Sequence, residues 1–173
     1  MNKSESKKRV KIIVEQYAHD HQRYKKNPPT EQDLQRNYIL PMLQALNWNI
    51  YNLEKVRQEK FIGDIQPDIY LVDEAGNIVC IEVKPDFQKL FPETDLEKYT
   101  VERVKRLGTR VVWLTSFKES QLHIFAEKSK KRIVKNITSR EYSARFDILW
   151  KYLSNDKEGI RTRAALKAHA TRK

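Results

Sequence analysis

The sequence has a single cysteine and no long apolar run. Because Cys80 stands alone, disulfide frameworks and cysteine-based zinc sites are excluded. No apolar stretch approaches the ~18 residues that a membrane-spanning helix needs, and the N-terminal segment is charged where a signal peptide would be apolar. The four histidines show no ligand spacing with one another or with the cysteine. We therefore expect a cytoplasmic protein that does not enter a membrane.

Positive charge is concentrated at the two ends of the chain. The 173 residues, enough for one domain with a real core, carry a net charge of +11. Residues 1–29 hold eight basic and three acidic residues, which gives +5, and residues 157–173 hold six and one, which again gives +5, so +1 remains for residues 30–156. Such ends are expected to meet nucleic-acid phosphates, although a solvated, solubilising surface has the same composition.

The first part of the chain has the apolar spacing of helices. Residues from about 5 to 25 are predicted to form an amphipathic helix, which Asn27-Pro28-Pro29 ends. Thr30 then caps a second helix with Asp33 three residues on. Pro41 should kink that helix, because proline lacks an N–H group. Beyond it the pattern predicts two strands, at residues 48–53 and within residues 56–61.

The centre of the sequence is typical of a β-hairpin. Two short apolar, β-branched runs, Ile69–Val72 and Ile78–Val83, flank a loop that suits three residues with Gly76 in the left-handed conformation. If Asp73 pairs with Asn77 across that loop, directly opposed residues share one face of the sheet. The pairs predicted in this way are Tyr70 with Cys80 and Asp68 with Glu82, and Lys84 lies on the same face.

This register gathers Asp68, Glu82 and Lys84 at one end of an otherwise apolar hairpin. Like charges buried together repel unless a cation lies between them. Mg²⁺ would relieve that repulsion, because it takes oxygen ligands and often binds one or two carboxylates together with water and substrate phosphate. The alternative is that Asp68 caps a turn after Pro67 and that Glu82 and Lys84 form an ordinary exposed pair. A strand covered on both sides, however, rarely carries charge without a function.

At these residues the sequence resembles the PD-(D/E)xK nuclease superfamily, with Pro67-Asp68 as the first half of the motif and Glu82-Val83-Lys84 as the second. Three further segments stand in an order similar to that of the nuclease domain at the N-terminus of type I restriction subunits and of fused type IIG restriction-modification enzymes. They are Thr30-Glu31 opening a helix, Leu46-Asn47-Trp48 closing it, and Asp95-Leu96-Glu97-Lys98-Tyr99 downstream. The resemblance covers roughly residues 30–155.

The resemblance implies an α/β, restriction-endonuclease-like fold: a mixed central β-sheet flanked by helices, here with an extra N-terminal helix and C-terminal helices. It implies Mg²⁺-dependent hydrolysis of double-stranded DNA, with Mn²⁺ as a substitute. Asp68, Glu82 and the backbone carbonyl of Val83 would hold the metal. Lys84 would orient and help deprotonate the attacking water, and Glu31 would hold a second metal or a water. A restriction system further implies methyltransferase, specificity or helicase modules in the same polypeptide or complex.

Downstream of the hairpin, helix and strand patterns alternate. Thr94 begins a helix with a capping box and Gly108 ends it. Within that helix Asp95 and Tyr99 match loosely a Gln-x-x-x-Tyr pattern of the resembled family, with Asp95 in place of the glutamine. The remaining predicted elements are strands at residues 110–114, 122–125 and 133–137 and helices at residues 146–153 and 157–170, the last of them exposed. The sheet is expected to have four to six strands.

We accordingly divide the chain into a basic N-terminal amphipathic helix (residues 1–29), a nuclease core (30–155) and a basic helical tail or connector (156–173). Two other functions stay open: a Holliday-junction or repair-type nuclease, and a non-catalytic nucleic-acid-binding module with the same fold. Glu31 has a second interpretation as a partner of its helix dipole. Cys80 is interpreted as a small buried thiol beside Tyr70 rather than as a nucleophile.

Overall fold

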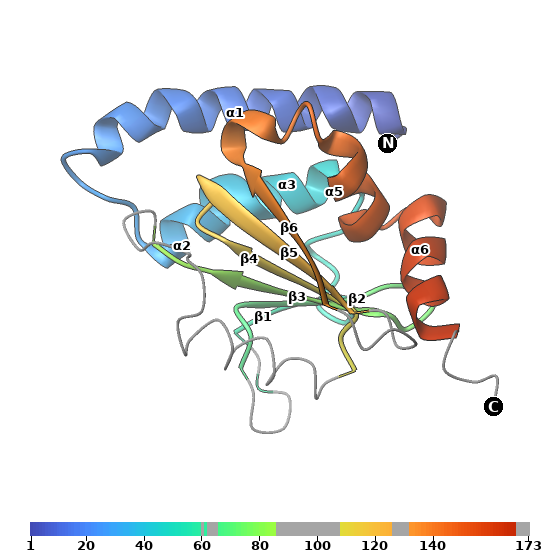
Figure 1. The fold of residues 1–173 in the computed structure, drawn as a ribbon. Coiled ribbons are helices and arrows are strands. Elements are labelled where there is room, and N and C mark those ends of the chain that lie inside the picture. The colour runs from blue at the N-terminus through green and yellow to red at the C-terminus, as the bar shows by residue number, and fades with distance from the viewer. Residues whose placement is uncertain (60, 62–65, 86–107, 126–131, 169–173) are drawn as a thin grey trace.

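The computed structural model describes residues 1–59, 61, 66–85, 108–125 and 132–168 (Figure 1). In this part of the chain a six-stranded sheet runs in the order β1-β2-β3-β4-β5-β6. Neighbouring strands are antiparallel except β3 and β4, which are parallel. The strands are β1 (Val56–Gln58), β2 (Ile69–Val72), β3 (Ile78–Val83), β4 (Val111–Thr115), β5 (Glu119–Phe125) and β6 (Arg132–Thr138). The predicted α/β class with a mixed sheet is confirmed.

Helices cover one face of this sheet. Figure 1 shows α1, α3 and α5 stacked over the strands, with α6 beside them. The helical elements are α1 (Lys3–Tyr24), α2 (Glu31–Leu34), the π-helical segment η1 (Gln35–Ile39), α3 (Leu40–Ala45), the 3-10 segment η2 (Ser139–Glu141), α5 (Phe146–Leu153) and α6 (Lys157–Ala168). Among the described residues, no helix has both the length and the apolarity needed to cross a membrane.

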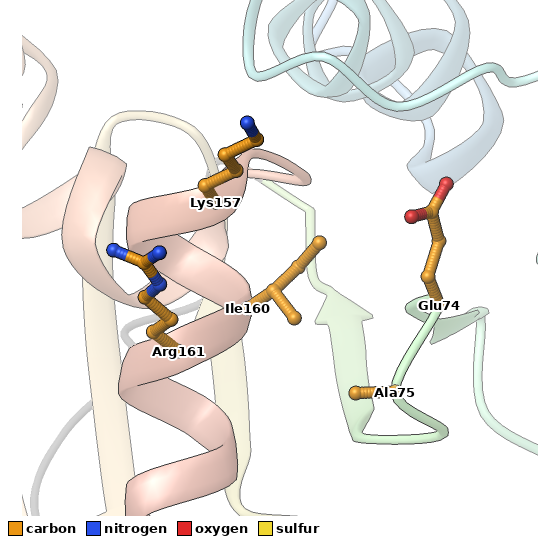
Figure 2. Close-up of a pocket in the computed structure, with 5 residues that line it drawn as sticks. All are labelled: Glu74, Ala75, Lys157, Ile160 and Arg161. Carbon is orange, nitrogen blue, oxygen red and sulfur yellow. The ribbon is translucent and has the colours of Figure 1, made fainter.

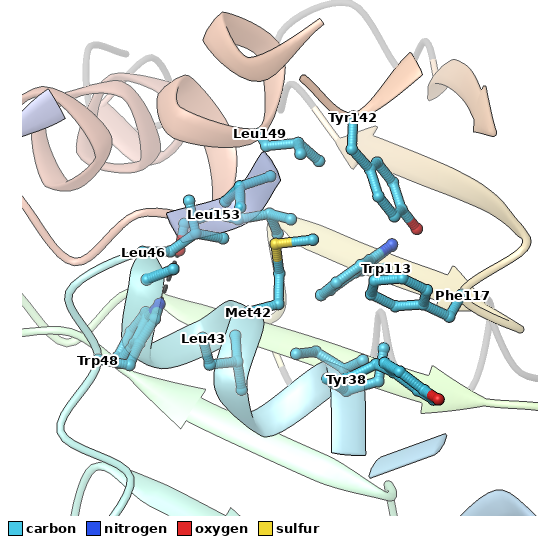
Figure 3. Close-up of a cluster of buried hydrophobic side chains, with 14 of the residues drawn as sticks. Tyr38, Met42, Leu43, Leu46, Trp48, Trp113, Phe117, Tyr142, Leu149 and Leu153 are labelled. Atoms are coloured by element: carbon cyan, nitrogen blue, oxygen red, sulfur yellow. Dashed lines mark hydrogen bonds between the residues drawn. The ribbon is translucent and has the colours of Figure 1, made fainter. Parts of the chain in front are cut away.

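The main core lies between these helices and the sheet. Figure 3 shows side chains of the helical segment from residue 38 to 46 meeting the sheet on one side and α5 on the other. Its fully buried members include Tyr38, Met42, Leu43, Leu46, Trp113, Phe117, Tyr142, Leu149 and Leu153. A second cluster of Tyr70, Cys80, Val112, Leu114 and Phe125 is buried on the opposite face. The central strands are therefore buried on both faces.

Local capping explains where the first two helices begin. The Asn2 side chain accepts from the Glu5 backbone N–H, and the Glu5 carboxylate accepts from the Asn2 N–H, both at 3.0 Å. Thr30 forms the same reciprocal box with Asp33, with N–H to oxygen distances of 2.9 and 3.1 Å. Each box satisfies backbone donors that a helix end leaves without partners. The helices predicted at both places are confirmed.

The disturbance predicted at Pro41 takes the form of a π-helical turn. The Leu40 N–H donates to the Gln35 carbonyl, five residues back, and the π segment lies directly before α3. Because Pro41 has no N–H and its ring crowds the preceding turn, the regular four-residue ladder cannot continue through it. The wider turn lets the chain remain helical across the proline.

The predicted strand at residues 48–53 is wrong. The side chain of Asn49 accepts from the Tyr51 N–H at 3.1 Å, and that of Asn52 accepts from the Glu54 N–H at 3.1 Å. These asparagine turns give the backbone partners that compete with strand pairing. Tyr51 and Leu53, whose apolar character suggested a strand, are 80% and 75% exposed. The following strand, β1, is confirmed but is only three residues long.

The hairpin forms in the predicted register. Tyr70 lies opposite Cys80, and the Asp73 N–H donates to the Asn77 carbonyl at 3.0 Å. Gly76 has a φ of 71°, the left-handed conformation that the loop requires. The pairing of Ile69 with Ile81 places Asp68 opposite Glu82 one residue further along.

The expectation that residues 157–170 form an exposed helix is half right. The segment is helical, but α6 is packed against the body of the domain rather than extended from it. Arg163 is 0% exposed, and its Nε donates to Asp73 Oδ2 at 2.9 Å. The charge pattern suggested a solvated tail because a buried arginine and an exposed one look alike in sequence. The predicted helix at residues 94–107, with Asp95 and Tyr99, lies outside the described residues.

Substitution by alanine should lower the folding stability at two glycines, Gly76 and Gly159, for different reasons. A Cβ at Gly76 would meet nothing within 4 Å, so the cost is that of the left-handed backbone, about 1 kcal/mol. A Cβ at Gly159 would lie 2.3 Å from the Ser154 carbonyl oxygen, so we expect Gly159→Ala to cost more, about 2–3 kcal/mol, although alanine favours helices.

Urea unfolding of the two variants measures this difference. Gly76→Asn is the control, and it should be closer to wild type than Gly76→Ala, because asparagine tolerates the left-handed region. A Gly159→Ala protein more stable than wild type would show that α6 does not dock against Ser154 as described.

Candidate functional site

Four sequence-predicted residues come together at one end of the hairpin. Asp68 directly precedes β2, and Glu82 lies near the end of β3, with Lys84 just beyond it. Glu31 is the first residue of α2, which starts at the same end of the sheet (Figure 1). Local capping positions Glu31, and the hairpin register positions the other three. The four therefore reach one place from three separate elements.

Asp68 is held against the backbone of β3. The Val83 N–H donates to Asp68 Oδ2 at 2.6 Å. This contact ties the first half of the motif to the second, because Val83 stands between Glu82 and Lys84. It also leaves Oδ1 of Asp68 without a hydrogen bond from any of the described residues. Oδ2 of Asp68 therefore has a structural role, because it binds the backbone of the second half of the motif.

Lys84 lies between two carboxylates. Its Nζ is 3.8 Å from Glu31 Oε1 and 3.9 Å from Glu82 Oε2. The Lys84 side chain is 20% exposed and that of Glu82 is 12% exposed, so this cation and this anion are largely shielded from water. Interactions at such distances are stronger than on an open surface. Lys84 offsets the negative charge that the carboxylates gather.

Two of the acids, Asp68 and Glu31, are partly removed from water. Burial raises the pKa of Asp68, against the opposing effects of the Val83 N–H and of Lys84. Burial also raises the pKa of Glu31, where Lys84 opposes the shift and the Asp68 carboxylate adds to it. Desolvation and mutual repulsion both disfavour the charged forms. A cation bound at this place would reverse that preference.

Glu59 is an acid of this neighbourhood that sequence reasoning did not single out. Its carboxylate contributes to the raised pKa of both Asp68 and Glu31. It follows β1 with a φ of 47°, and its N–H donates to the Asp68 carbonyl at 3.0 Å. The Gln66 side chain donates to the Glu59 carbonyl at 2.8 Å. The pairing of β1 with β2 brings Glu59 here, and only a correct length for β1 could have predicted it.

The donor set fits a hard divalent cation that keeps part of its water. Asp68 and Glu82 offer carboxylate oxygens, and the Val83 carbonyl is the third candidate donor. Within the described residues, no three His, Cys, Asp or Glu side chains gather closely enough to hold a metal ion by themselves. Mg²⁺ needs no such cage, because it commonly binds through one or two carboxylates with water and substrate phosphate.

Cys80 has the character expected of a packed thiol. It is fully buried, and its Sγ lies 3.3 Å from the Thr109 hydroxyl. Burial raises the pKa of Cys80 to about 12, so the thiol is protonated at neutral pH. A nucleophilic cysteine needs the thiolate form. Cys80 shares the sheet face of Glu82 without the chemistry of a nucleophile.

The starts of α1 and α6 lie close together at the far end of the molecule (Figure 1). Lys3 in α1 contacts Asp147 Oδ1 at 3.0 Å and Glu158 Oε2 at 3.2 Å, which joins α1 to α5 and α6. Figure 1 shows the starts of α1 and α6 on one side and the start of α2 on the other. A pocket of about 310 Å³ opens beside the hairpin loop at that far end (Figure 2). It is lined by Glu74, Ala75, Lys157, Ile160 and Arg161.

The raised pKa of Asp68 predicts how stability depends on pH in the metal-free protein. The folded state binds the Asp68 proton more tightly than the unfolded state does, so stability falls as pH rises from the ordinary aspartate pKa through the raised one. Asp68→Asn removes that loss and keeps an acceptor for the Val83 N–H. We expect the variant to unfold at higher urea than wild type at pH 7.

Urea midpoints measured from pH 3 to pH 7.5 in a metal chelator test this expectation. The gap between the two proteins should close at the acidic end, where Asp68 is protonated in both states. A variant that is less stable than wild type at neutral pH would mean that the carboxylate is stabilised, not strained, at this position.

Comparisons with protein-family models, with curated proteins and with solved structures find no match to this chain. Its function is therefore inferred from its own residues and their geometry.

Proposed function

We propose that the protein is a metal-dependent endonuclease that hydrolyses phosphodiester bonds of double-stranded DNA, as the cleavage domain of a restriction-modification enzyme. One observation supports this above all. Asp68, Glu82, Lys84 and Glu31, each chosen from the sequence for this chemistry, meet at one end of a hairpin that is otherwise apolar. Bringing charged groups together away from water costs free energy. Such groups occur most often at catalytic sites.

The residues divide the chemistry among them. Asp68, Glu82 and the Val83 carbonyl would bind Mg²⁺, or Mn²⁺ in its place, and the bound ion supplies charge stabilisation at the phosphate and a more acidic water. Lys84 would orient the attacking water and help to deprotonate it. Its Nζ lies 3.8 Å from Glu31 Oε1. Glu31 would hold a second metal or a water. Shielding from solvent strengthens the contact between Lys84 and Glu82, whose side chains are 20% and 12% exposed.

We also propose that the fold is restriction-endonuclease-like. A hairpin that carries the acids, followed by a parallel strand, agrees with this class. The restriction system, with methyltransferase, specificity or helicase modules as partners, follows from the resemblance of residues 30–155. The nearly neutral central segment should have weak DNA affinity of its own, which agrees with specificity supplied by another module.

A non-catalytic DNA-binding module is the second candidate. The observation that favours it is that Lys84 already offsets Glu31 and Glu82, so the cluster is partly neutralised without a metal ion. A Holliday-junction or repair-type nuclease would use the same residues on branched DNA. Metal titration separates the first alternative from the main proposal, and cleavage of branched against linear duplexes separates the second.

Removing either acid should abolish metal-dependent cleavage. Asp68→Ala and Glu82→Ala each delete a carboxylate ligand, and we expect at least about a 10²-fold loss in nicking of supercoiled plasmid with Mg²⁺. Lys84→Ala should lose turnover to a similar degree yet keep its affinity for Ca²⁺ or Mn²⁺, measured by calorimetry, because the oxygen ligands remain.

The matched control for these variants is Glu74→Ala. Glu74 is also a carboxylate of the hairpin, but it lies in the loop at the opposite end and pairs with Lys55 at 3.7 Å. It should cleave like wild type. Full activity of both acid variants would refute the nuclease assignment, and an equal loss of metal affinity in Lys84→Ala and Asp68→Ala would refute the division of roles.

The exposed cations of α6 should contribute to DNA affinity without reading sequence. Lys157 and Arg161 are exposed, and phosphate contacts weaken with salt by a slope of roughly −0.9 per phosphate neutralised. We expect Lys157→Gln/Arg161→Gln to flatten the slope by one to two such units, roughly. Point substitutions are needed because deletion of residues 157–173 would also remove the buried Arg163.

Fluorescence anisotropy on a short duplex between 50 and 200 mM salt, roughly the range over which such slopes are read, provides the measurement. Lys3→Gln is the control, since Lys3 is already paired with Asp147 and Glu158 and should change the slope less. An unchanged slope in the double variant would show that α6 faces away from bound DNA.

A further inference from the structure

The loop of the site hairpin is organised by one buried carboxylate. Asp73 Oδ1 accepts from the backbone N–H groups of Ala75 and Asn77, each at 2.9 Å. The Asn77 side-chain amide donates to both oxygens, at 3.1 and 2.9 Å. The side chain of Asp73 is 0% exposed. All of these bonds suit an ionised carboxylate, which is a strong acceptor at two oxygens.

A buried anion of this kind needs a counter-charge, and α6 provides it. Arg163 Nε donates to Asp73 Oδ2 at 2.9 Å, and the arginine side chain is also 0% exposed. Its Nη1 donates to the carbonyls of Tyr152 and Ser154, at 3.1 and 2.8 Å, and its guanidinium lies over the Trp48 ring at 5.7 Å. Removing one member of a buried pair leaves the other charge uncompensated. The loop therefore depends on a residue that lies 90 positions away in sequence.

The hydrophobic pattern of the hairpin does not by itself select a register. A slip of one residue moves every side chain to the other face, and the change is usually prevented because one face is polar. Here Val79, Cys80 and Ile81 are successive and all 0% exposed, and Ile69, Tyr70 and Leu71 are likewise buried. Both faces accept apolar side chains. The turn must then supply the specification that alternation supplies elsewhere.

The register decides where the acids lie. Asp68 precedes β2 by one residue, and its Oδ2 reaches the Val83 N–H only because Ile69 pairs with Ile81. A slipped hairpin would direct Asp68 and Glu82 to opposite faces. The turn that excludes this slip stands at the other end of both strands.

We propose that Arg163 is a positioning residue, which holds the β2–β3 register from the loop end of the hairpin and thereby sets Asp68 against Val83 and Glu82. Its effect on the register stands on the contacts above. Its effect on cleavage rests on the proposed nuclease function. Helix α6 would thus have two roles: its exposed cations would contact phosphate, and its buried Arg163 would position the hairpin.

Hydrogen exchange of the Val83 amide reads the register directly, because that N–H binds Asp68. In Arg163→Met we expect the Val83 amide to exchange at least about tenfold faster relative to the amides of Val112 and Trp113 in β4, whose pairing does not depend on the loop. Arg161→Met is the matched control. It removes an exposed arginine two positions away in the same helix, and the Val83 amide should keep its wild-type rate.

Cleavage kinetics test whether the change in register affects catalysis. With Mg²⁺ and duplex DNA, Arg163→Met should lower kcat about tenfold and leave KM within about twofold, after correction for the folded fraction. A uniform rise in exchange across β3 and β4 would overturn the proposal, because it would show a general loss of stability. Faster exchange at Val83 with unchanged kcat would overturn the link to catalysis. If wild type does not cleave DNA at all, the nuclease assignment fails while the exchange result still decides the register.

A second pair of variants guards against poor folding of Arg163→Met. Arg163→Lys keeps the positive charge but loses the several N–H donors of the guanidinium. The exchange rate of its Val83 amide should therefore lie between those of wild type and Arg163→Met. Asp73→Asn/Arg163→Met removes both charges and keeps an oxygen acceptor for the N–H groups of the loop. Val83 should exchange more slowly in this double variant than in Arg163→Met. An equal rate in the two would show that Arg163 does not act by neutralising Asp73.

Discussion

The pairing of β2 with β3 is the constraint on which the candidate site depends. Both strands are buried on two faces, so the loop from Asp73 to Asn77 has to determine which residues face each other. Once Tyr70 lies opposite Cys80, the positions of Asp68 and Glu82 follow from the alternation of the strand. The placement of the candidate site residues therefore depends on the turn between β2 and β3.

Buried carboxylates occur at both ends of the hairpin, but they are compensated to different degrees. At the site end, Lys84 stands between Glu31 and Glu82, and burial raises the pKa of Glu31 and of Asp68. At the loop end, the buried Asp73 has a close partner in Arg163 and a full set of donors. The carboxylate of Asp73 has its hydrogen-bond donors and its counter-charge, whereas burial and mutual repulsion still disfavour the charged forms of Asp68 and Glu31.

Several elements were predictable because their determinants lie within a few residues of one another. Thr30 and Asp33 indicate the start of a helix, and Gly76 indicates the loop. Both features depend on hydrogen bonds between residues three or four positions apart. The strand predicted at residues 48–53 failed for a related reason. Apolar spacing suggested a strand, but the short-range bonds of Asn49 and Asn52 were stronger determinants than the spacing.

The α/β class, the hairpin register and the candidate residues Asp68, Glu82, Lys84 and Glu31 could be predicted from the sequence, because helix capping and the turn at Gly76 depend on residues a few positions apart. Three features could not be predicted in this way: the 3.8 Å separation of Glu31 Oε1 and Lys84 Nζ, the place of Glu59 near Asp68 and Glu31, and the burial of Arg163 against Asp73. Sequence separation is the reason. Packing sets such contacts between distant segments, and a charged side chain carries no local sign of whether it will face water or a buried partner.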